Sequence, residues 1–336
     1  MPAIPVPRRP QPDPDTMGRL PTRPALTSVA AASRARACAG LIMLGVLLAT
    51  NDAGAQVDEP AARTLSGALK RIKSSGVVRI GYRADAVPFS YEVREGQPHG
   101  YSIDLCAAVV ADIAGEIGVS SLRTEYRRVT TADRIDQVAD RRVDLECGAS
   151  TNTAERRARV AFSPLTFVSG TRLLVRRGEG VHSLRELAGR RVAVVRGTTN
   201  EAVIHQLAAR PAGAFTVLAA NDQAQALAWL ADGRADALAA DDILIVALLA
   251  ERGLQRQYAV VGELLSYEPY GIMFARDDPP LAGVVDAAFR RLAQTREIRW
   301  IYDKWFMRSL PSGARLGVPM STQLERSLQL LGLPPE

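Results

Sequence analysis

The sequence lacks the motifs on which most enzymes and metal proteins depend. Its three histidines, His99, His182 and His205, show no metal-ligand spacing with one another or with the three cysteines. It contains no G-x-S-x-G motif, no phosphate-binding P-loop and no G-x-G-x-x-G after a strand. We therefore expect no catalytic residue, no cofactor and no metal site.

Long apolar runs and an excess of one charge are scarce as well. Residues 1–55 hold six arginines against three aspartates, and beyond them basic and acidic residues nearly balance, so no nucleic-acid partner is expected. The apolar run at 39–49, "AGLIMLGVLLA", is about half the ~20 residues that span a bilayer. With 47% hydrophobic residues, the 336-residue chain can bury the cores of about two domains.

Residues 1–55 have the pattern of an export signal with a leader. Arg34 and Arg36 precede the apolar run, and "AGAQ" offers a cleavage site that ends at Ala55. We expect a cleaved signal, a linker at 56–64 and a periplasmic protein. An uncleaved membrane anchor is the alternative, and Met17 is an alternative start of translation to Met1.

Two cysteines, Cys106 and Cys147, would remain after cleavage. An oxidising compartment favours a disulfide between them. The alternative is a pair of buried thiols that behave as small hydrophobic residues.

The region beyond the leader alternates strand and helix patterns in two series. In the first, a strand at 76–83 precedes an amphipathic helix at 101–118, followed by "LRTEYRRV", "TADRIDQVADRR" and "VDLECG". The second series runs from "RRVAVVRG" to "ADALAAD", at 190–241. This βαβαβ order predicts an α/β protein with two lobes, each a mostly parallel sheet flanked by helices.

A third region returns the chain to the first lobe. It adds the strand "YGIMFARDD" and one long amphipathic helix at 281–306. The chain would then cross between lobes twice, near 168–171 and 268–270, which favours a two-strand hinge. We expect lobe 1 at 65–169 and 270–309, lobe 2 at 170–269, and a C-terminal tail of surface chain at 310–336.

Several residues could hold an anion. Thr198 and Thr199 stand between a strand and a helix start, where free N–H groups favour a negative group, although ordinary capping explains them equally. Ser150 and Thr151 offer hydroxyls, and Arg156 offers a planar fork for a carboxylate, unless this loop is only a solvated helix start.

Three more charged residues stand at the ends of predicted elements. Arg134 lies in the first turn of a helix, where a cation is unfavourable unless an anion faces it. Arg83 directly follows a strand. Asp241 and Asp242 end a strand and begin a helix, so each could be a cap or a ligand-binding group.

Together these segments resemble a known family. Their order and spacing are those of the periplasmic glutamate/aspartate-binding proteins of ABC importers, which are two-lobed type II solute-binding proteins with a two-strand hinge. The resemblance covers about residues 65–306. It rests on "GYRADAVPFSYE", "GYSIDLCAAVV", "TTADRI", "DLECGASTNTAERRARVAFS", "GTRLLV", "RGTTNE", "DDILI" and "YGIMFARDDP".

The resemblance implies a role for each candidate residue. Arg156, assisted by Thr151, Thr198 and Thr199, would hold the ligand's α-carboxylate, and Asp241 would hold its α-ammonium group. Arg83, Thr131 and Arg134 would hold the distal carboxylate. Tyr270 lies in the matching hinge segment, but no ligand contact is assigned to it. The liganded protein, expected to be a monomer, would dock to ABC permease subunits in the inner membrane.

Two positions depart from the family's pattern. Ala149 stands where the family often has serine, and Gln223 stands where some members have a histidine near the distal carboxylate. The preference among glutamate, aspartate and their amides is therefore open. An enzyme resembling cyclohexadienyl dehydratase, with Glu146 as its acid or base, and a receptor that reports to a sensor are the alternatives.

Overall fold

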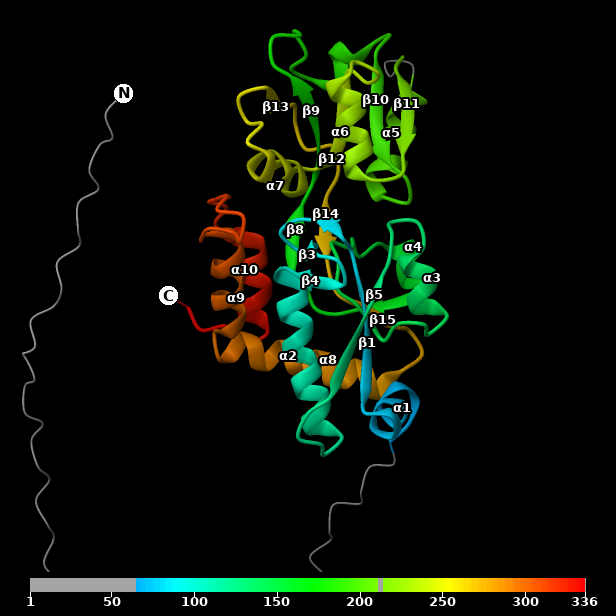
Figure 1. Ribbon diagram of the computed structural model, residues 1–336, viewed down its shortest axis with the longest axis vertical. Helices are drawn as coiled ribbons and strands as arrows, with labels where there is room; N and C mark the ends of the chain where they lie inside the picture. Colours follow the sequence, from blue (N-terminus) through cyan, green and yellow to red (C-terminus); the bar gives the residue numbers. More distant parts are fainter. Residues whose placement is uncertain (1–64, 211–213, 336) are drawn as a thin grey trace, which may run out of the picture. The chain divides into compact units, whose positions relative to one another are not determined.

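The computed structural model describes residues 65–210 and 214–335 (Figure 1). The expected signal peptide, its cleavage site, both candidate start positions and the linker at 56–64 lie outside the described residues. Within the described ranges, no helix combines the length and apolar character needed to cross a membrane.

The first lobe is built on a five-stranded sheet. Its strands are β1 (Val77–Tyr82), β5 (Arg123–Arg128), β6 (Leu145–Glu146), β7 (Val160–Phe162) and β15 (Met273–Ala275). The strand order is β5, β1, β6, β15, β7, and β1 is parallel to both its neighbours while β15 is antiparallel to both of its own. Four of the five strands thus run in one direction, as the sequence predicts for a mostly parallel sheet.

Helices and a small second sheet complete this lobe (Figure 1). The small sheet orders β2 (Asp85–Ala86), β3 (Ser90–Arg94) and β4 (Gln97–His99). The helices are α1 (Gly67–Ser75), α2 (Tyr101–Glu116), α3 (Arg134–Ala139), α4 (Ala154–Arg157), α8 (Pro279–Gln294) and α9 (Glu297–Phe306). The apolar residues of α2 recur at helical spacing, and their burial gives this lobe its core.

The second lobe repeats the same sheet topology. Its strands are β9 (Thr171–Arg176), β10 (Arg191–Val195), β11 (Thr216–Ala220), β12 (Ala237–Asp241) and β13 (Tyr258–Val261). The order is β11, β10, β12, β9, β13, with β9 alone running against the others. Its helices are the short 3-10 helix η1 (Leu184–Leu187), α5 (Thr199–Ala208), α6 (Gln223–Ala231) and α7 (Asp242–Arg252).

Two antiparallel strands connect the lobes. They are β8 (Phe167–Ser169) and β14 (Glu268–Tyr270), which form a two-stranded sheet and run between the two larger sheets in Figure 1. These strands coincide with the two crossings that the sequence predicts. A two-strand connection of this kind lets lobes rotate about a small number of residues.

The C-terminal region differs from the sequence prediction in two ways. The single long helix expected at 281–306 is two helices, α8 and α9, because Arg296 takes a left-handed conformation with a φ of 60°. The expected surface tail is wrong as well, since it contains α10 (Thr322–Leu330), which begins at the capping residue Ser321. Leu324 and Leu328 of α10 are buried in the core of the first lobe.

Cys106 and Cys147 form a disulfide in the first lobe. The bond joins α2 to the residue after β6, at the start of the loop at 148–151. The same loop is held from α2 by Ser102, whose hydroxyl donates to the Gly148 carbonyl at 2.7 Å. The loop that carries several predicted ligand-binding residues is therefore fixed by both a covalent bond and a buried hydrogen bond.

Candidate functional site

The residues predicted to bind a ligand follow strands of the two sheets. Arg83 follows β1, Thr151 follows β6, and Arg134 begins the helix after β5. Thr198 follows β10, and Asp241 ends β12. The carboxyl ends of parallel strands meet at one edge of a sheet, which is where α/β proteins bind ligands.

A small cavity of about 20 Å³ lies among these residues. All the predicted ligand-binding residues except Ser150 and Arg156 line it, together with Ala149, Val195, Asn200, Ala240 and Leu244. Each lobe contributes part of the lining. Among the described residues, no group of three or more histidine, cysteine, aspartate or glutamate side chains is placed to hold a metal ion.

Arg134 is a buried cation whose Nε makes no hydrogen bond to a described residue, although the charge of the buried Glu146 acts on it. Only 2% of the residue is exposed. Burial, together with the charge of the neighbouring Arg156, lowers the pKa of its guanidinium to about 9. Such a charge is costly unless something anionic meets it. Arg134 lines the cavity, so an anion bound there would contact its guanidinium.

Arg83 differs from Arg134 because its guanidinium already forms an ion pair with the carboxylate of Asp85. Its Nε and Nη2 donate to one oxygen of Asp85, at 2.8 and 2.6 Å. The backbone N–H of Arg83 donates to Ser90 at 2.9 Å, which fixes the start of the loop after β1. Of the two arginines predicted to hold a distal carboxylate, Arg134 is therefore the one whose Nε has no hydrogen-bond partner among the described residues.

Asp241 is the fixed anion on the opposite side of the cavity. Asn200 donates to its Oδ1 at 2.8 Å, and the Tyr270 hydroxyl donates to its Oδ2 in a short hydrogen bond. Burial, together with the charge of the nearby Glu268, raises the pKa of the Asp241 carboxyl to about 6. Asp241 makes no side-chain cap on α7, so its carboxylate remains available to a cation.

Arg156 and Ser150 lie outside the cavity lining. Arg156 is buried, and its guanidinium donates to the carbonyl of Thr151 at 2.9 Å and to that of Gly197 at 3.4 Å. Burial lowers the pKa of this guanidinium. The Ser150 hydroxyl is fully buried without a hydrogen-bond partner among the described residues. In this structure Arg156 therefore fixes the backbone of the site from both lobes.

Glu146 is a second buried carboxyl, beneath the cavity. It is fully buried, and neither side-chain oxygen has a hydrogen-bond partner among the described residues. Burial raises the pKa of its carboxyl, against the opposing effect of the Arg134 charge. A Cβ at Gly148 would lie 2.3 Å from Glu146 Oε1, so a larger residue at this position would displace the Glu146 side chain. Sequence reasoning considered Glu146 only as a possible enzymatic group.

The two lobes touch at the cavity rim. The hydroxyls of Thr151 and Thr199 lie 3.4 Å apart, and Thr199 donates to Glu268 at 2.6 Å. A Cβ at Gly197, where φ is +70°, would lie 2.6 Å from the Thr131 carbonyl. Glycine at this position thus permits a close approach of the two backbones.

The sequence prediction missed Asn200 and Glu268 in this site, and it assigned no contact to Tyr270. Asn200 follows the two threonines at the start of α5, a position that sequence alone assigns equally well to capping. Glu268 and Tyr270 belong to β14 and reach the site from the hinge. The polar and aromatic residues next to the predicted second crossing between the lobes are the feature of the sequence from which they could have been predicted.

Comparisons with known proteins agree with this architecture. The family model described as bacterial extracellular solute-binding proteins, family 3, matches residues 78–308. The chain is 35% identical over 283 residues to the L-glutamate/L-aspartate-binding protein of Pseudomonas aeruginosa, covering 83% of this chain and 94% of that protein. It is 32% identical over 257 residues to the glutamate/aspartate import solute-binding protein of Escherichia coli, covering 76% and 85%.

A solved structure shares the fold. It is an ancestral amino acid-binding protein, described as a precursor of cyclohexadienyl dehydratase. The match has a TM-score of 0.61 at 26% identity and covers 71% of this chain and 99% of that chain. The paired sheets and the two-strand connection are those of a two-lobed type II periplasmic binding protein. The chain belongs to the bacterial extracellular solute-binding proteins, family 3.

Proposed function

We propose that this protein captures glutamate or aspartate between its two lobes and delivers it to an ABC importer. The observation that carries the proposal is that two buried groups of opposite charge line one cavity: the Arg134 guanidinium, whose Nε has no hydrogen-bond partner among the described residues, and the Asp241 carboxylate. The names of the relatives from Pseudomonas aeruginosa and Escherichia coli support the same ligand class.

The bound amino acid would match the charges of the cavity. Its ammonium group would pair with Asp241, and its distal carboxylate would meet Arg134, with Arg83, Thr131 and Gln223 beside it. Arg156, Ser150, Thr151, Thr198 and Thr199 would form the region that receives the α-carboxylate. Burying a charged ligand is favourable only when each charge finds a partner, and this arrangement supplies the partners.

The lobes would close on the ligand by rotation about β8 and β14. We assign residues 65–169 and 270–309 to lobe 1, residues 170–269 to lobe 2, and residues 310–336 to a C-terminal segment. We further propose that the protein acts as a periplasmic monomer that docks to permease subunits in its liganded form. Its partners would be an acidic amino acid and those membrane subunits.

A binding protein is favoured over an enzyme on the same scaffold. A dehydratase needs an acid or base that reaches the substrate. Glu146, the group considered for that role, does not line the cavity, and its oxygens are buried. Its position suits a carboxyl that balances the arginine charges from below.

Titration calorimetry tests this function. The protein would be stripped of ligand by unfolding and refolding, then titrated with glutamate, aspartate, glutamine and alanine. We expect one-to-one binding of glutamate or aspartate, weaker binding of glutamine and no heat from alanine. Equal binding of all four would contradict the proposal, as would silence towards both acidic amino acids. Incubation of prephenate with the same sample tests the dehydratase alternative, and we expect no turnover.

A further inference from the structure

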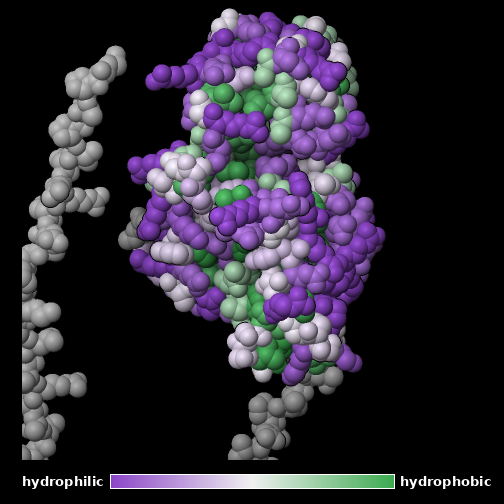
Figure 2. Space-filling view, viewed as in Figure 1, coloured by the Kyte–Doolittle hydropathy of each residue, from purple (hydrophilic) through white to green (hydrophobic). Residues whose placement is uncertain are grey.

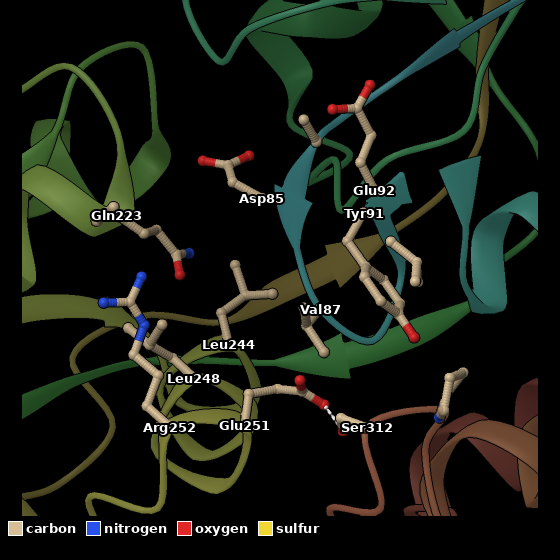
Figure 3. A pocket seen from close by; sticks show the side chains of 14 residues that line it. Asp85, Val87, Tyr91, Glu92, Gln223, Leu244, Leu248, Glu251, Arg252 and Ser312 are labelled. Atoms are coloured by element: carbon tan, nitrogen blue, oxygen red, sulfur yellow. Dashed lines mark hydrogen bonds between the residues drawn. The ribbon is translucent and has the colours of Figure 1, made fainter. Parts of the chain in front are cut away.

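A larger pocket lies beside the small cavity and has no role in the proposed function. Its volume is about 400 Å³, and it is lined from both lobes and from the segment after α9 (Figure 3). We call it the outer pocket. Its lining residues are Ala84, Asp85, Val87, Tyr91, Glu92, Val93, Gln223, Ala224, Leu244, Leu248, Glu251, Arg252, Pro311 and Ser312.

Gln223 and Leu244 line both the outer pocket and the small cavity. Gln223 is 7% exposed, and its side-chain amide makes no hydrogen bond to any described residue. Figure 3 shows this amide reaching into the space between Asp85 and Leu244. This amide has unused donors and an unused acceptor at the pocket wall, so a ligand there could make hydrogen bonds with it.

The distal end of the small cavity suits an amide as well as a carboxylate. Asp85 already accepts two hydrogen bonds from Arg83, which leaves Arg134 as the arginine there whose Nε has no hydrogen-bond partner among the described residues. An amide carbonyl can accept from Arg134, and its N–H can donate to the Gln223 oxygen. A substituent on that nitrogen would then extend past Gln223 into the outer pocket.

The outer pocket has the chemistry to receive an alkyl chain that ends in a cation. Two of its three carboxylates already pair with arginines outside the lining, Asp85 with Arg83 at 2.6 Å and Glu92 with Arg128 at 4.0 Å. Glu251 is the carboxylate of the lining that makes no ion pair with a described residue. Glu251 accepts from Ser312 through Oε1 at 2.5 Å, and its Oε2 accepts no hydrogen bond from the described residues. Apolar side chains, among them Val87, Leu244 and Leu248, lie between these groups (Figure 3).

We propose that the outer pocket is a second subsite, which binds the cationic end of a glutamate side-chain amide such as an alkyl amine joined to the γ-carboxyl group. The proposal rests on the proposed function, because it requires the amino-acid end of the ligand in the small cavity. Gln223 would bind the amide at the junction, and Glu251 would pair with the distal ammonium group.

Two matched probes test the subsite. One is glutamine whose side-chain nitrogen carries a 4-aminobutyl group, and the other carries an uncharged butyl group at the same nitrogen. Both are titrated into the ligand-stripped protein alongside glutamate. We expect the cationic probe to bind about tenfold more tightly than the butyl probe, because partly buried opposite charges attract strongly at close range.

Glu251→Gln separates this subsite from the amino-acid site. It should reduce the advantage of the cationic probe at least about threefold, because it removes the charge that pairs with the ammonium group. Glutamate affinity should change less than about twofold, since Glu251 does not line the small cavity. Glu263→Gln, at an exposed glutamate of the same lobe, is the matched control and should change neither.

Each outcome decides the proposal. If both probes fail to bind while glutamate binds, the subsite is wrong and the proposed function stands. If the two probes bind equally, or if Glu251→Gln leaves their ratio unchanged, the cationic subsite is overturned. If the cationic probe binds and glutamate does not, the proposed function fails while the subsite remains. Silence towards all three ligands overturns both.

Discussion

The two halves of the candidate site differ in how their buried charged groups are hydrogen-bonded. In the first lobe, Arg134 is buried with its Nε unsatisfied, and Glu146 lies nearby with both oxygens unsatisfied. In the second lobe, both oxygens of Asp241 accept hydrogen bonds, from Asn200 and Tyr270. The first half thus leaves hydrogen-bonding atoms of Arg134 and Glu146 without partners among the described residues, while in the second half both carboxylate oxygens accept a hydrogen bond.

This difference assigns a task to each half. A preorganised carboxylate with fixed donors presents constant geometry to an ammonium group, which every α-amino acid carries. An unsatisfied arginine gains most from a ligand that brings a second carboxylate. The second lobe would therefore provide affinity for amino acids in general, and the first lobe would provide the preference for acidic ones.

Removal of the Asp241 charge should have the largest effect. Asp241→Asn keeps the shape but leaves the ligand's ammonium buried without a counter-charge, which costs about 3–5 kcal/mol of binding free energy. Calorimetry should show a loss of at least about 100-fold for glutamate and for aspartate. Asp242→Asn is the matched control, because Asp242 does not line the cavity. A loss of less than about tenfold for Asp241→Asn would contradict the assignment.

The disulfide lies in the first lobe, so its removal should lower the stability of that lobe more than that of the second. It closes a loop whose ends are 41 residues apart, and its removal by Cys106→Ala with Cys147→Ala should cost about 2–4 kcal/mol of unfolding free energy. Urea unfolding measures the total loss. Hydrogen exchange should place it in β1, β5 and β6 and leave β10, β11 and β12 protected. Equal loss of protection in both sheets would contradict the comparison.

Arg134→Met should separate function from stability. The variant should lose about 1.5–3 kcal/mol of binding free energy for glutamate, because it removes a charge-assisted hydrogen bond. Glutamine should lose less, since it brings no distal charge. The unliganded variant should unfold at a higher temperature than the wild type, because a buried cation whose Nε has no hydrogen-bond partner among the described residues is gone. Lower thermal stability together with equal loss for both ligands would argue that Arg134 serves the fold.

The smallest effect concerns pH. A protonated Asp241 cannot pair with an ammonium group, so glutamate affinity should fall as the pH drops through about 6, the pKa of this carboxyl. The Tyr270 hydrogen bond lowers that pKa, so in Tyr270→Phe the fall should begin at a higher pH. The hydrogen bond itself contributes about 0.5–1.5 kcal/mol. A fall that begins near 4.3, where the ligand's own side chain titrates, would contradict the role of Asp241.

Local patterns predicted much of this molecule. The alternation of β-branched runs with helical spacing predicted both sheets, and the crossings near 168–171 and 268–270 are β8 and β14. The prediction of surface chain for the C-terminal segment was wrong. Its proline and glycine residues favoured irregular structure, but it contains a helix capped by Ser321. Leu324 and Leu328 have helical spacing, but so short an apolar pattern does not predict a helix by itself. Such a helix becomes stable only when it packs against another surface.

Site residues were predictable where the order of the strands alone places them. They were not predictable where their contacts join residues that are far apart in the sequence. Arg134 and Asp241 follow strands, so strand order alone brings them to the same edge. Asn200 meets Asp241 across 41 residues, and Thr199 meets Glu268 across 69, contacts that depend on the folded lobes. Arg156 was predicted as a carboxylate fork, but here its guanidinium donates to two backbone carbonyls.

A crystal structure of the protein grown with L-glutamate tests the central claim most directly. The account predicts one glutamate in the cavity between the lobes, with its ammonium group on Asp241 and its distal carboxylate on Arg134. A glutamate bound in the reverse orientation, or bound outside this cavity, would contradict the division of recognition between the two lobes.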